Sequence, residues 1–422
     1  MKTRLSLQFV LVWVLLAVMT ACNTTKFVPQ GEYLLNDVKV RVQDTKTVAS
    51  SDLVKYVQQR ENTEILGFWK LQLAIYNTAS LDTTKWTSKN ARKIGEAPVV
   101  FSSEMADASV VQLGKAMKNK GYFRAQVDTA MSVKDRKVNL VYNIVANEPY
   151  KISDYEVDFR HPELLSIATN ERFALVSAGD QFDADILNQE RQRVASAMRR
   201  LGYYYFDAEC IRFLVDSMRM KQQLDVVMCL HPRIEEMTDE EQARLFRKYT
   251  INQVCFHMDY DMGRTPEDED VYSSSMDGYE FTWVGQKLLR NNVLIRNCPI
   301  RPGDRYNERL VEQVYTRLNK MAPVKYVDVS FVPASDSTLD CHIVLSRNKL
   351  NSISAELEGT YSAGDWGVAA GVGYANRNLF RGAEEFSMDA RASYEWRQSG
   401  GRAIEARAAA ELRFPSDVSV EV

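Results

Sequence analysis

Toward the C-terminus, four runs of residues place an apolar residue or glycine at every second position, with polar, charged or small residues between. The runs cover residues 353–361, 366–374, 386–396 and 404–414. A period of two over about 9–11 residues, with aromatic residues near the ends, is typical of strands with lipid on one side and water on the other. A half-buried sheet of a soluble sandwich shares this period. The aromatic ends and the charges confined to one side favour the first strands of an antiparallel transmembrane β-barrel.

The opposite end of the chain predicts export. Two basic residues precede a mostly apolar stretch, residues 7–18, which is too short to span a bilayer and ends in small residues. Residues 1–21 therefore predict a signal peptide. Cys22 follows directly, as in a bacterial lipobox, which implies cleavage before Cys22 and lipidation of its thiol. An ordinary signal with a chance cysteine is the alternative, and residues 22–31 are expected to form a short polar tether.

Charge and cysteine content exclude several classes of protein. The 422 residues carry a formal net charge of −3 and have no basic patch interleaved with aromatic residues, so nucleic acid is not an expected partner. The cysteines after Cys22 are too few for a disulfide scaffold and lack zinc-site spacing. Cys210 and Cys229 could pair across a hairpin in an oxidising compartment, or they could remain buried free thiols.

The middle of the chain repeats one order of elements three times: a strand, a helical region, a second helix and two strands. The second helices have apolar residues three and four apart, a pattern that requires a sheet beneath them. The strands expected after them are residues 125–131 with 137–145, 208–215 with 223–230, and 326–332 with 339–345. These repeats predict three small α+β modules followed by a barrel part, at residues 32–148, 149–232, 249–349 and 350–422.

Short motifs mark the repeats. A Gly-Asp turn precedes the second helix of the second and third repeats, beginning at Gly179 and Gly303. The glycine supplies a flexible turn, and Asp183 or Asn307 is placed to cap the helix that follows. The third repeat also carries an acidic insertion, residues 266–270, which is expected to be a surface loop.

Tandem β-α-α-β-β modules that lead into a membrane barrel resemble the POTRA modules of the BamA/TamA outer-membrane assembly superfamily. The Gly-Asp turns, the helices that end in Gly-Tyr and a hairpin motif at the start of the barrel carry this resemblance. The hairpin motif consists of Asn376, Asn378, Leu379, Phe380, Gly382, Ala383 and Glu384. Arg381 stands where glycine is common in the family. The start of the chain, residues 25–35, is similar to the TamA-like lipoproteins of Bacteroidetes.

The resemblance implies a function, a location and partners. It implies an assembly factor that receives unfolded outer-membrane proteins in the periplasm and inserts them through a β-barrel. The chain would lie in the bacterial outer membrane, among its lipids, with the modules in the periplasm and an anchor at Cys22. A periplasm-spanning or lipoprotein partner is also implied. A two-partner-type secretion pore and a structural lipoprotein that bridges the envelope are the alternatives.

The modules themselves suggest how clients bind. Each is expected to have a three-stranded sheet with one exposed edge, which an unfolded client or a partner can extend with its own strand. We expect the strand after each second helix to serve this role. The residues proposed for it are Ala125, Val127, Ala208, Ile211, Val327 and Val329. Edges that simply face water or a neighbouring module are the alternative.

The number of barrel strands is a departure from the family. Only about four strands fit into residues 351–422, and a closed barrel of this family needs several times more residues. The chain is therefore expected to be a fragment or a truncated gene product.

No pattern predicts catalysis or a cofactor. The sequence around Ser362 is the nearest match to a nucleophile elbow, but Thr360 replaces the glycine that such an elbow requires. Two Cys-His pairs fall on expected strands, where core or surface positions are favoured over metal ligation. These pairs are Cys255 with His257 and Cys341 with His342. We expect a protein that is not an enzyme and that binds no metal or cofactor.

Overall fold

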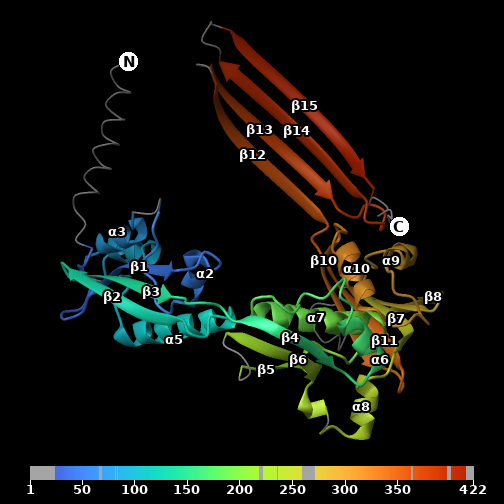
Figure 1. Cartoon of the computed structure of the whole chain (residues 1–422). Coiled ribbons are helices and arrows are strands. Elements are labelled where there is room, and N and C mark those ends of the chain that lie inside the picture. Colours follow the sequence, from blue (N-terminus) through green and yellow to red (C-terminus); the bar gives the residue numbers. More distant parts are fainter. Residues whose placement is uncertain are drawn as a thin grey trace. The chain divides into compact units, whose positions relative to one another are not determined.

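The computed structural model describes residues 24–65, 69–80, 82, 84–217, 222–234, 236–258, 271–362, 365–396 and 401–414 (Figure 1). The chain divides into two compact units. The first comprises residues 1–158, 171–190 and 213–228, and the second comprises residues 159–170, 191–212 and 229–422. The predicted signal peptide, Cys22 and the acidic segment 266–270 lie outside the described residues. The predicted α+β class is confirmed, since three small mixed sheets with helices precede an antiparallel sheet.

The first predicted module forms a three-stranded sheet beneath a long helix. Its elements are β1 (Leu34–Gln43), α2 (Ser50–Leu53), η1 (Val54–Tyr56), α3 (Leu71–Asn77), α4 (Trp86–Ile94), α5 (Ser103–Asn119), β2 (Gln126–Lys134) and β3 (Lys137–Val145). The sheet order is β1-β3-β2, with β1 parallel and β2 antiparallel to β3. Leu113 and Met117 of α5 share one buried core with Leu140 and Tyr142 of β3, as the amphipathic pattern of this helix requires.

The second predicted module has the expected order of elements with one correction. Its elements are β4 (Lys151–Asp158), α6 (Pro162–Ala168), α7 (Ala184–Arg200), η2 (Ala208–Cys210), β5 (Ile211–Asp216) and β6 (Gln223–Leu230). The sheet order is β4-β6-β5. The strand predicted from Ala208 begins only at Ile211, because the Asp207 carboxylate accepts hydrogen bonds from the amides of Glu209 and Cys210 and caps a short 3₁₀ helix. Two short helices follow, η3 (Pro232–Ile234) and α8 (Asp239–Leu245).

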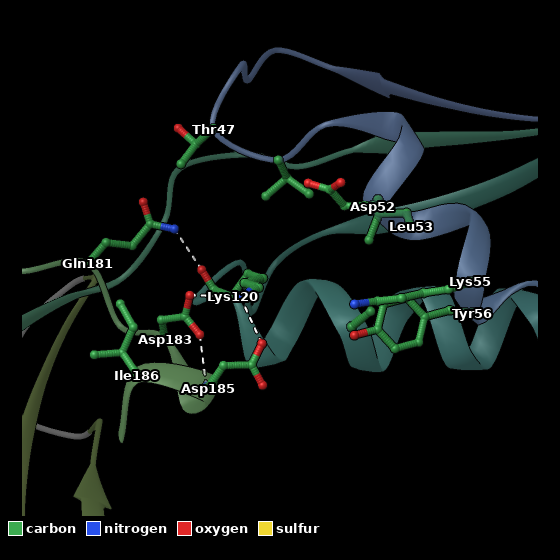
Figure 2. Close-up of a pocket in the computed structure, with 12 residues that line it drawn as sticks. Thr47, Asp52, Leu53, Lys55, Tyr56, Lys120, Gln181, Asp183, Asp185 and Ile186 are labelled. Carbon is green, nitrogen blue, oxygen red and sulfur yellow. Dashed lines mark hydrogen bonds and ion pairs between the residues drawn. The ribbon is translucent and has the colours of Figure 1, made fainter. Parts of the chain in front are cut away.

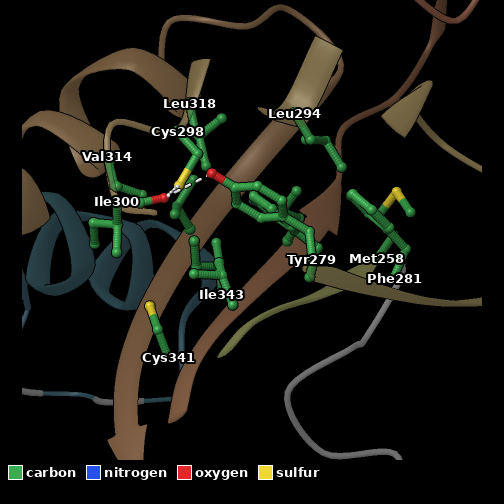
Figure 3. Packing of buried hydrophobic residues seen from close by; sticks show 14 of the residues in the cluster. Met258, Tyr279, Phe281, Leu294, Cys298, Ile300, Val314, Leu318, Cys341 and Ile343 are labelled. Atoms are coloured by element: carbon green, nitrogen blue, oxygen red, sulfur yellow. Dashed lines mark hydrogen bonds between the residues drawn. The ribbon is translucent and has the colours of Figure 1, made fainter. Parts of the chain in front are cut away.

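The third module has five strands where three were predicted. Its elements are β7 (Thr250–Met258), β8 (Val271–Met276), β9 (Tyr279–Val284), α9 (Asn291–Asn297), α10 (Glu308–Leu318), β10 (Val324–Pro333) and β11 (Thr338–Arg347). The sheet order is β10-β11-β7-β9-β8. The unpredicted hairpin β8–β9 joins the sheet because Phe281 is fully buried beside Phe256 of β7. Leu294, Val314 and Leu318 of the two helices cover Ile343 and its neighbours in the same core (Figure 3).

The Gly-Asp turns of the second and third modules make the same backbone contacts with the first strand of their module. The bonds of the second module are Gly179 N to Ile152 O at 2.7 Å, Ile152 N to Asp180 O at 2.8 Å and Phe182 N to Tyr150 O at 3.0 Å. Those of the third are Gly303 N to Ile251 O at 2.7 Å, Ile251 N to Asp304 O at 2.8 Å and Tyr306 N to Tyr249 O at 2.9 Å. The predicted helix caps are confirmed, since Asp183 accepts from Asp185 N and Asn307 accepts from Arg309 N.

A glycine at the end of α5 allows the first module to contact the turn of the second. Gly121 has φ +87°, and a Cβ on it would lie 2.5 Å from Phe182 O. Its carbonyl accepts a 2.9 Å hydrogen bond from Tyr150 N. The residues of both modules that meet at this junction belong to the first unit. Through these contacts, Gly121 fixes the start of β4 against the end of α5.

We predict that Gly121→Ala opens this junction. Holding alanine in this left-handed conformation costs roughly 1–2 kcal/mol. The clash between its Cβ and Phe182 O would also displace the backbone. Hydrogen exchange of the Tyr150 amide measures the effect, and it is expected to accelerate. Gly179→Ala is the matched control, because Gly179 has φ +96° but no atom within 4 Å of its Cβ position. Equal exchange of the Tyr150 amide in the two variants would contradict the role of close contact.

The C-terminal strands form a sheet with one apolar face. The strands are β12 (Asn351–Ser362), β13 (Asp365–Asn376), β14 (Glu385–Trp396) and β15 (Arg402–Arg413), each antiparallel to the next. Their register aligns the apolar positions, as in the row Leu357, Ala370, Ala392 and Ala406. The opposite face carries charged rows, with an ion pair between Glu358 and Arg391. The side chain of Leu357 is 88% exposed, and an apolar face open to this extent calls for a nonpolar environment.

Candidate functional site

Each module leaves the strand after its long second helix at the edge of its sheet. These strands are β2, β5 and β10. An edge strand carries backbone N–H and C=O groups that point away from its single neighbour, and an extended peptide can pair with them. The geometry therefore offers three places where another chain could add a strand.

β2 is the most exposed of these edges. Ala125, just before the strand, and Val127 within it pack against the core of the first module. The rest of β2 is exposed, including Met131 at 55% and Val133 at 49%. This strand therefore combines a free backbone edge with apolar side chains that a client could cover.

The edge strands of the second and third modules are less exposed than β2. In the second module, Ile211 is buried in β5, and Ala208 is buried in η2 and contributes no strand backbone. In the third, Val327 of β10 is buried and Val329 packs against the core. The amide of Val329 donates a 3.0 Å hydrogen bond to the Tyr315 hydroxyl of α10, so one donor of the β10 edge is already occupied.

The hairpin motif between β13 and β14 forms a compact turn around two buried polar side chains. We call residues 376–384 the docking turn. Asn378 Oδ1 accepts from Ala383 N at 3.1 Å, and Asn376 Oδ1 accepts from Asn378 N at 3.0 Å. The Glu384 carboxylate accepts from Gly382 N at 2.8 Å and from Phe380 N at 3.3 Å. Asn378 and Glu384 are both buried, so these bonds satisfy polar groups that would otherwise destabilise the turn.

The docking turn is bound to the loop before α9 in the third module. Asn378 Nδ2 donates to Leu288 O at 2.7 Å, and Arg290 N donates to Arg381 O at 3.0 Å. The Arg290 guanidinium pairs with Glu384 Oε1 at 2.9 Å. Ala383 belongs to the hydrophobic core of the module. All these residues lie in the second unit, so the turn connects the apolar sheet firmly to the third module.

Two residues of the docking turn have left-handed backbone angles. Arg381 has φ +61° and Ala383 has φ +66°, a region that favours glycine. A Cβ on Gly382 would lie 2.7 Å from Arg290 Nη2 and closer still to Glu384 Oε1, so a larger residue there would displace the ends of the two paired side chains. Leu379 and Phe380 are 41% and 57% exposed, and they contribute to the network through their backbone amides, which donate to Glu384 O and to the Glu384 carboxylate.

Sequence reasoning found one half of this network. The motif residues were predicted, but Leu288 and Arg290 were not. They occupy an irregular loop between β9 and α9, and a single arginine before a helix has many alternative roles. Only the fold brings this arginine to the Glu384 carboxylate.

A cavity of about 360 Å³ lies in the first unit, beside the junction of the first and second modules (Figure 2). The Lys120 ammonium binds Asp183 at 2.9 Å and Asp185 at 2.8 Å, and Gln181 donates to Lys120 O at 2.7 Å. Burial opposes the charge on Lys120, but the two carboxylates outweigh it and raise the pKa of the ammonium group. The contact therefore stays charged at neutral pH.

The two Cys-His pairs lie on strands as predicted, Cys255 and His257 on β7 and Cys341 and His342 on β11. The five described cysteines are buried free thiols, and burial raises the pKa of the Cys210 thiol to about 12. Cys210 and Cys229 are not bridged. His257 Nε2 lies 2.9 Å from His342 Nδ1. Burial, and to a smaller extent the neighbouring His342, lowers the pKa of His257. The described residues contain no group of three or more side chains that could hold a metal ion.

No helix among the described residues is both long enough and apolar enough to cross a membrane. Cys22, the predicted lipidation site, lies outside the described residues.

Comparisons with known proteins identify structural neighbours only. No protein-family profile and no curated protein matches the chain. The POTRA3–5 domains of BamA from Haemophilus influenzae share 13% identity and a TM-score of 0.37, covering 76% of this chain and 99% of that one. BamA from Haemophilus ducreyi lacking POTRA domains 1–3 shares 12% identity and a TM-score of 0.34, with 62% of this chain and 47% of that one covered.

A CdiB structure is also among the neighbours. CdiB from Acinetobacter baumannii shares 9% identity and a TM-score of 0.26, covering 94% of this chain and 45% of that one. The chain thus spans less than half the length of the Haemophilus ducreyi BamA and of this CdiB. Because these TM-scores are all below 0.5, the function proposed next rests on the chain's own geometry.

Proposed function

We propose that this chain is part of an outer-membrane protein assembly factor of the BamA/TamA kind. In this proposal, unfolded outer-membrane proteins bind to the module edges in the periplasm and then pass to the barrel that begins with β12–β15. The role is one of binding and transport, with no catalytic step and no cofactor.

The observation that carries the proposal is the repeated free edge. Among the described residues, three successive modules each place one strand, β2, β5 or β10, at the edge of its sheet beside a single neighbour. Backbone pairing is independent of side-chain sequence, so it suits clients that share only their strand-forming pattern. The one-sided apolar sheet of β12–β15 lies in the same chain and supports a membrane destination for those clients.

The docking turn supports a mechanical connection between the two parts. Buried Asn378 and Glu384 hold the β13–β14 hairpin against Leu288 and Arg290 of the third module. A client strand released from β10 would therefore meet a hairpin whose position relative to the third module is fixed. This arrangement would shorten the path of a client strand from the module edge to the barrel.

The proposed location is the bacterial outer membrane, with the modules in the periplasm. Removal of residues 1–21 and lipidation of Cys22 would anchor the N-terminus to a membrane leaflet. The proposed partners are outer-membrane lipids, unfolded outer-membrane proteins and a periplasm-spanning or lipoprotein component. Nucleic acid is not among them.

Site-specific photo-crosslinking tests the client role of β2. A photo-reactive residue in place of Met131 is expected to crosslink to unfolded outer-membrane proteins, identified by mass spectrometry. The same residue in place of Val111, on α5 of the same module, is the matched control, because these side chains are 55% and 56% exposed. Equal crosslinking of barrel proteins from the two positions, or none from Met131, would count against the edge mechanism.

A further inference from the structure

The residues expected to form a tether are docked onto the first module. Lys26 Nζ donates to Asn77 O at 3.0 Å and to Ala79 O at 2.6 Å, at the C-terminal end of α3. Val28 is buried in a small cluster with Leu34 and Leu73. Contacts with the first module therefore begin at Thr24, whose carbonyl accepts from Asn77 Nδ2, only two residues after Cys22.

Aromatic and cationic side chains connect this segment to both α3 and α4. The Phe27 ring meets the Tyr76 ring edge to face, with centroids 5.4 Å apart. The Arg92 guanidinium of α4 lies 5.2 Å from the Phe27 centroid and 5.9 Å from that of Tyr76. Arg92 also donates to Ser80 O at 3.2 Å, and the buried Ser88 hydroxyl accepts from Ser80 N at 3.0 Å. One side of α4 thus packs against α3 and the docked segment.

The opposite side of α4 presents an apolar stripe beside a basic one. Trp86 and Ile94, eight residues apart on the helix, are 75% and 66% exposed. Lys89 and Lys93 are four residues apart, which places them along one adjacent line of the helix, and Lys85 is the N-cap residue just before it. All three lysines are exposed, and no carboxylate of the described residues forms an ion pair with them. The helix itself contains no acidic residue.

We propose that this α4 surface, formed by Trp86, Ile94, Lys85, Lys89 and Lys93, binds the headgroup region of an anionic phospholipid membrane. Tryptophan favours the membrane–water interface, and a helix with apolar and basic sides lies in the interface plane. The lysines complement the negative charge of the lipid surface.

The position of Cys22 adds a second argument, which rests on the lipidation proposed above. Two residues span at most about 7 Å of extended chain. A lipid on Cys22 would therefore hold Thr24, and the ends of α3 and α4 packed against the docked segment, close to the membrane. The helices α3 and α4 would then serve to hold the first module on the lipid surface.

A fluorescent label on the full chain tests this proposal. A bimane at Asn90→Cys, between Trp86 and Ile94, is exposed to vesicles of phosphatidylethanolamine and brominated phosphatidylglycerol. The same label at Val111→Cys on α5 is the control. Both variants carry Cys22→Ser, so that no lipid anchor contributes. The proposal predicts quenching at position 90 and much less at position 111.

The lysines supply the second readout. Each contributes roughly fivefold to binding near an anionic surface, so replacing Lys85, Lys89 and Lys93 with glutamine is expected to weaken vesicle contact at position 90 about a hundredfold. Equal quenching at positions 90 and 111, or quenching unaffected by these three replacements, would overturn the proposal. Whether Cys22 carries lipid is read separately from the mass of the mature N-terminus, so failure of the anchor would leave this result interpretable.

Discussion

Glu384→Ala is expected to release the docking turn from the third module while the strands β12–β15 remain paired. The side chain of Glu384 is only 8% exposed, and its carboxylate accepts hydrogen bonds from the Arg290 guanidinium, Gly382 N and Phe380 N. Its removal leaves two backbone donors without an acceptor inside the turn, at a cost of roughly 1–3 kcal/mol for each group that stays buried. The turn is therefore expected to open and hydrate.

Hydrogen exchange measures this opening directly. The amides of Gly382 and Phe380 are expected to exchange faster by about one to two orders of magnitude, since 1.4 kcal/mol corresponds to a factor of ten. Glu358→Ala is the control, because its pair with Arg391 has both side chains more than half exposed and such pairs contribute little. Unchanged protection of Gly382 in Glu384→Ala would show that the turn does not depend on this carboxylate.

Leu357→Arg is expected to abolish stable insertion of the C-terminal sheet into a membrane. Leu357 lies near the middle of β12, on the apolar face and 88% exposed. An arginine at the bilayer midplane on the lipid face of a barrel costs roughly 2–4 kcal/mol, a large share of the net stability of most folded proteins. Urea extraction of isolated membranes measures the inserted fraction of the protein.

Ser354→Arg is the matched control for this substitution. It introduces the same charge on the same strand, but on the polar face, where Ser354 is paired with Gly373. The Ser354→Arg protein is expected to resist extraction as the unaltered protein does. If the two arginine variants behave alike, the apolar face of this sheet does not meet lipid.

Local patterns predicted most of the fold. Strict alternation predicted β12–β15 because one face of each strand has a uniform environment along its length. The Gly-Asp turns predicted helix starts, and Asp183 and Asn307 cap α7 and α10 as expected. These features depend on neighbours within a few residues, so the sequence alone contains the information.

Features that depend on distant residues were not predicted. The β8–β9 hairpin joins the third sheet through Phe281 packing on Phe256. Its two-residue turn, Asp277-Gly278, has positive φ at both positions and is a local hairpin signal that was overlooked. The docked segment depends on Arg92, far along the chain from Phe27. Arg290 meets Glu384 only through the tertiary fold. The predicted strand at Ala208 was wrong because a single side chain, Asp207, redirects the backbone.

Depletion of the protein in its native cell, followed by quantification of folded β-barrel proteins in the outer membrane, tests the central claim most directly. The proposed assembly role predicts that many barrel proteins fall together and that their unfolded forms accumulate in the periplasm. Restoration of the unaltered protein is expected to reverse the loss. Unchanged barrel proteins, together with the loss of one secreted polypeptide, would contradict the assembly role and favour a two-partner secretion pore.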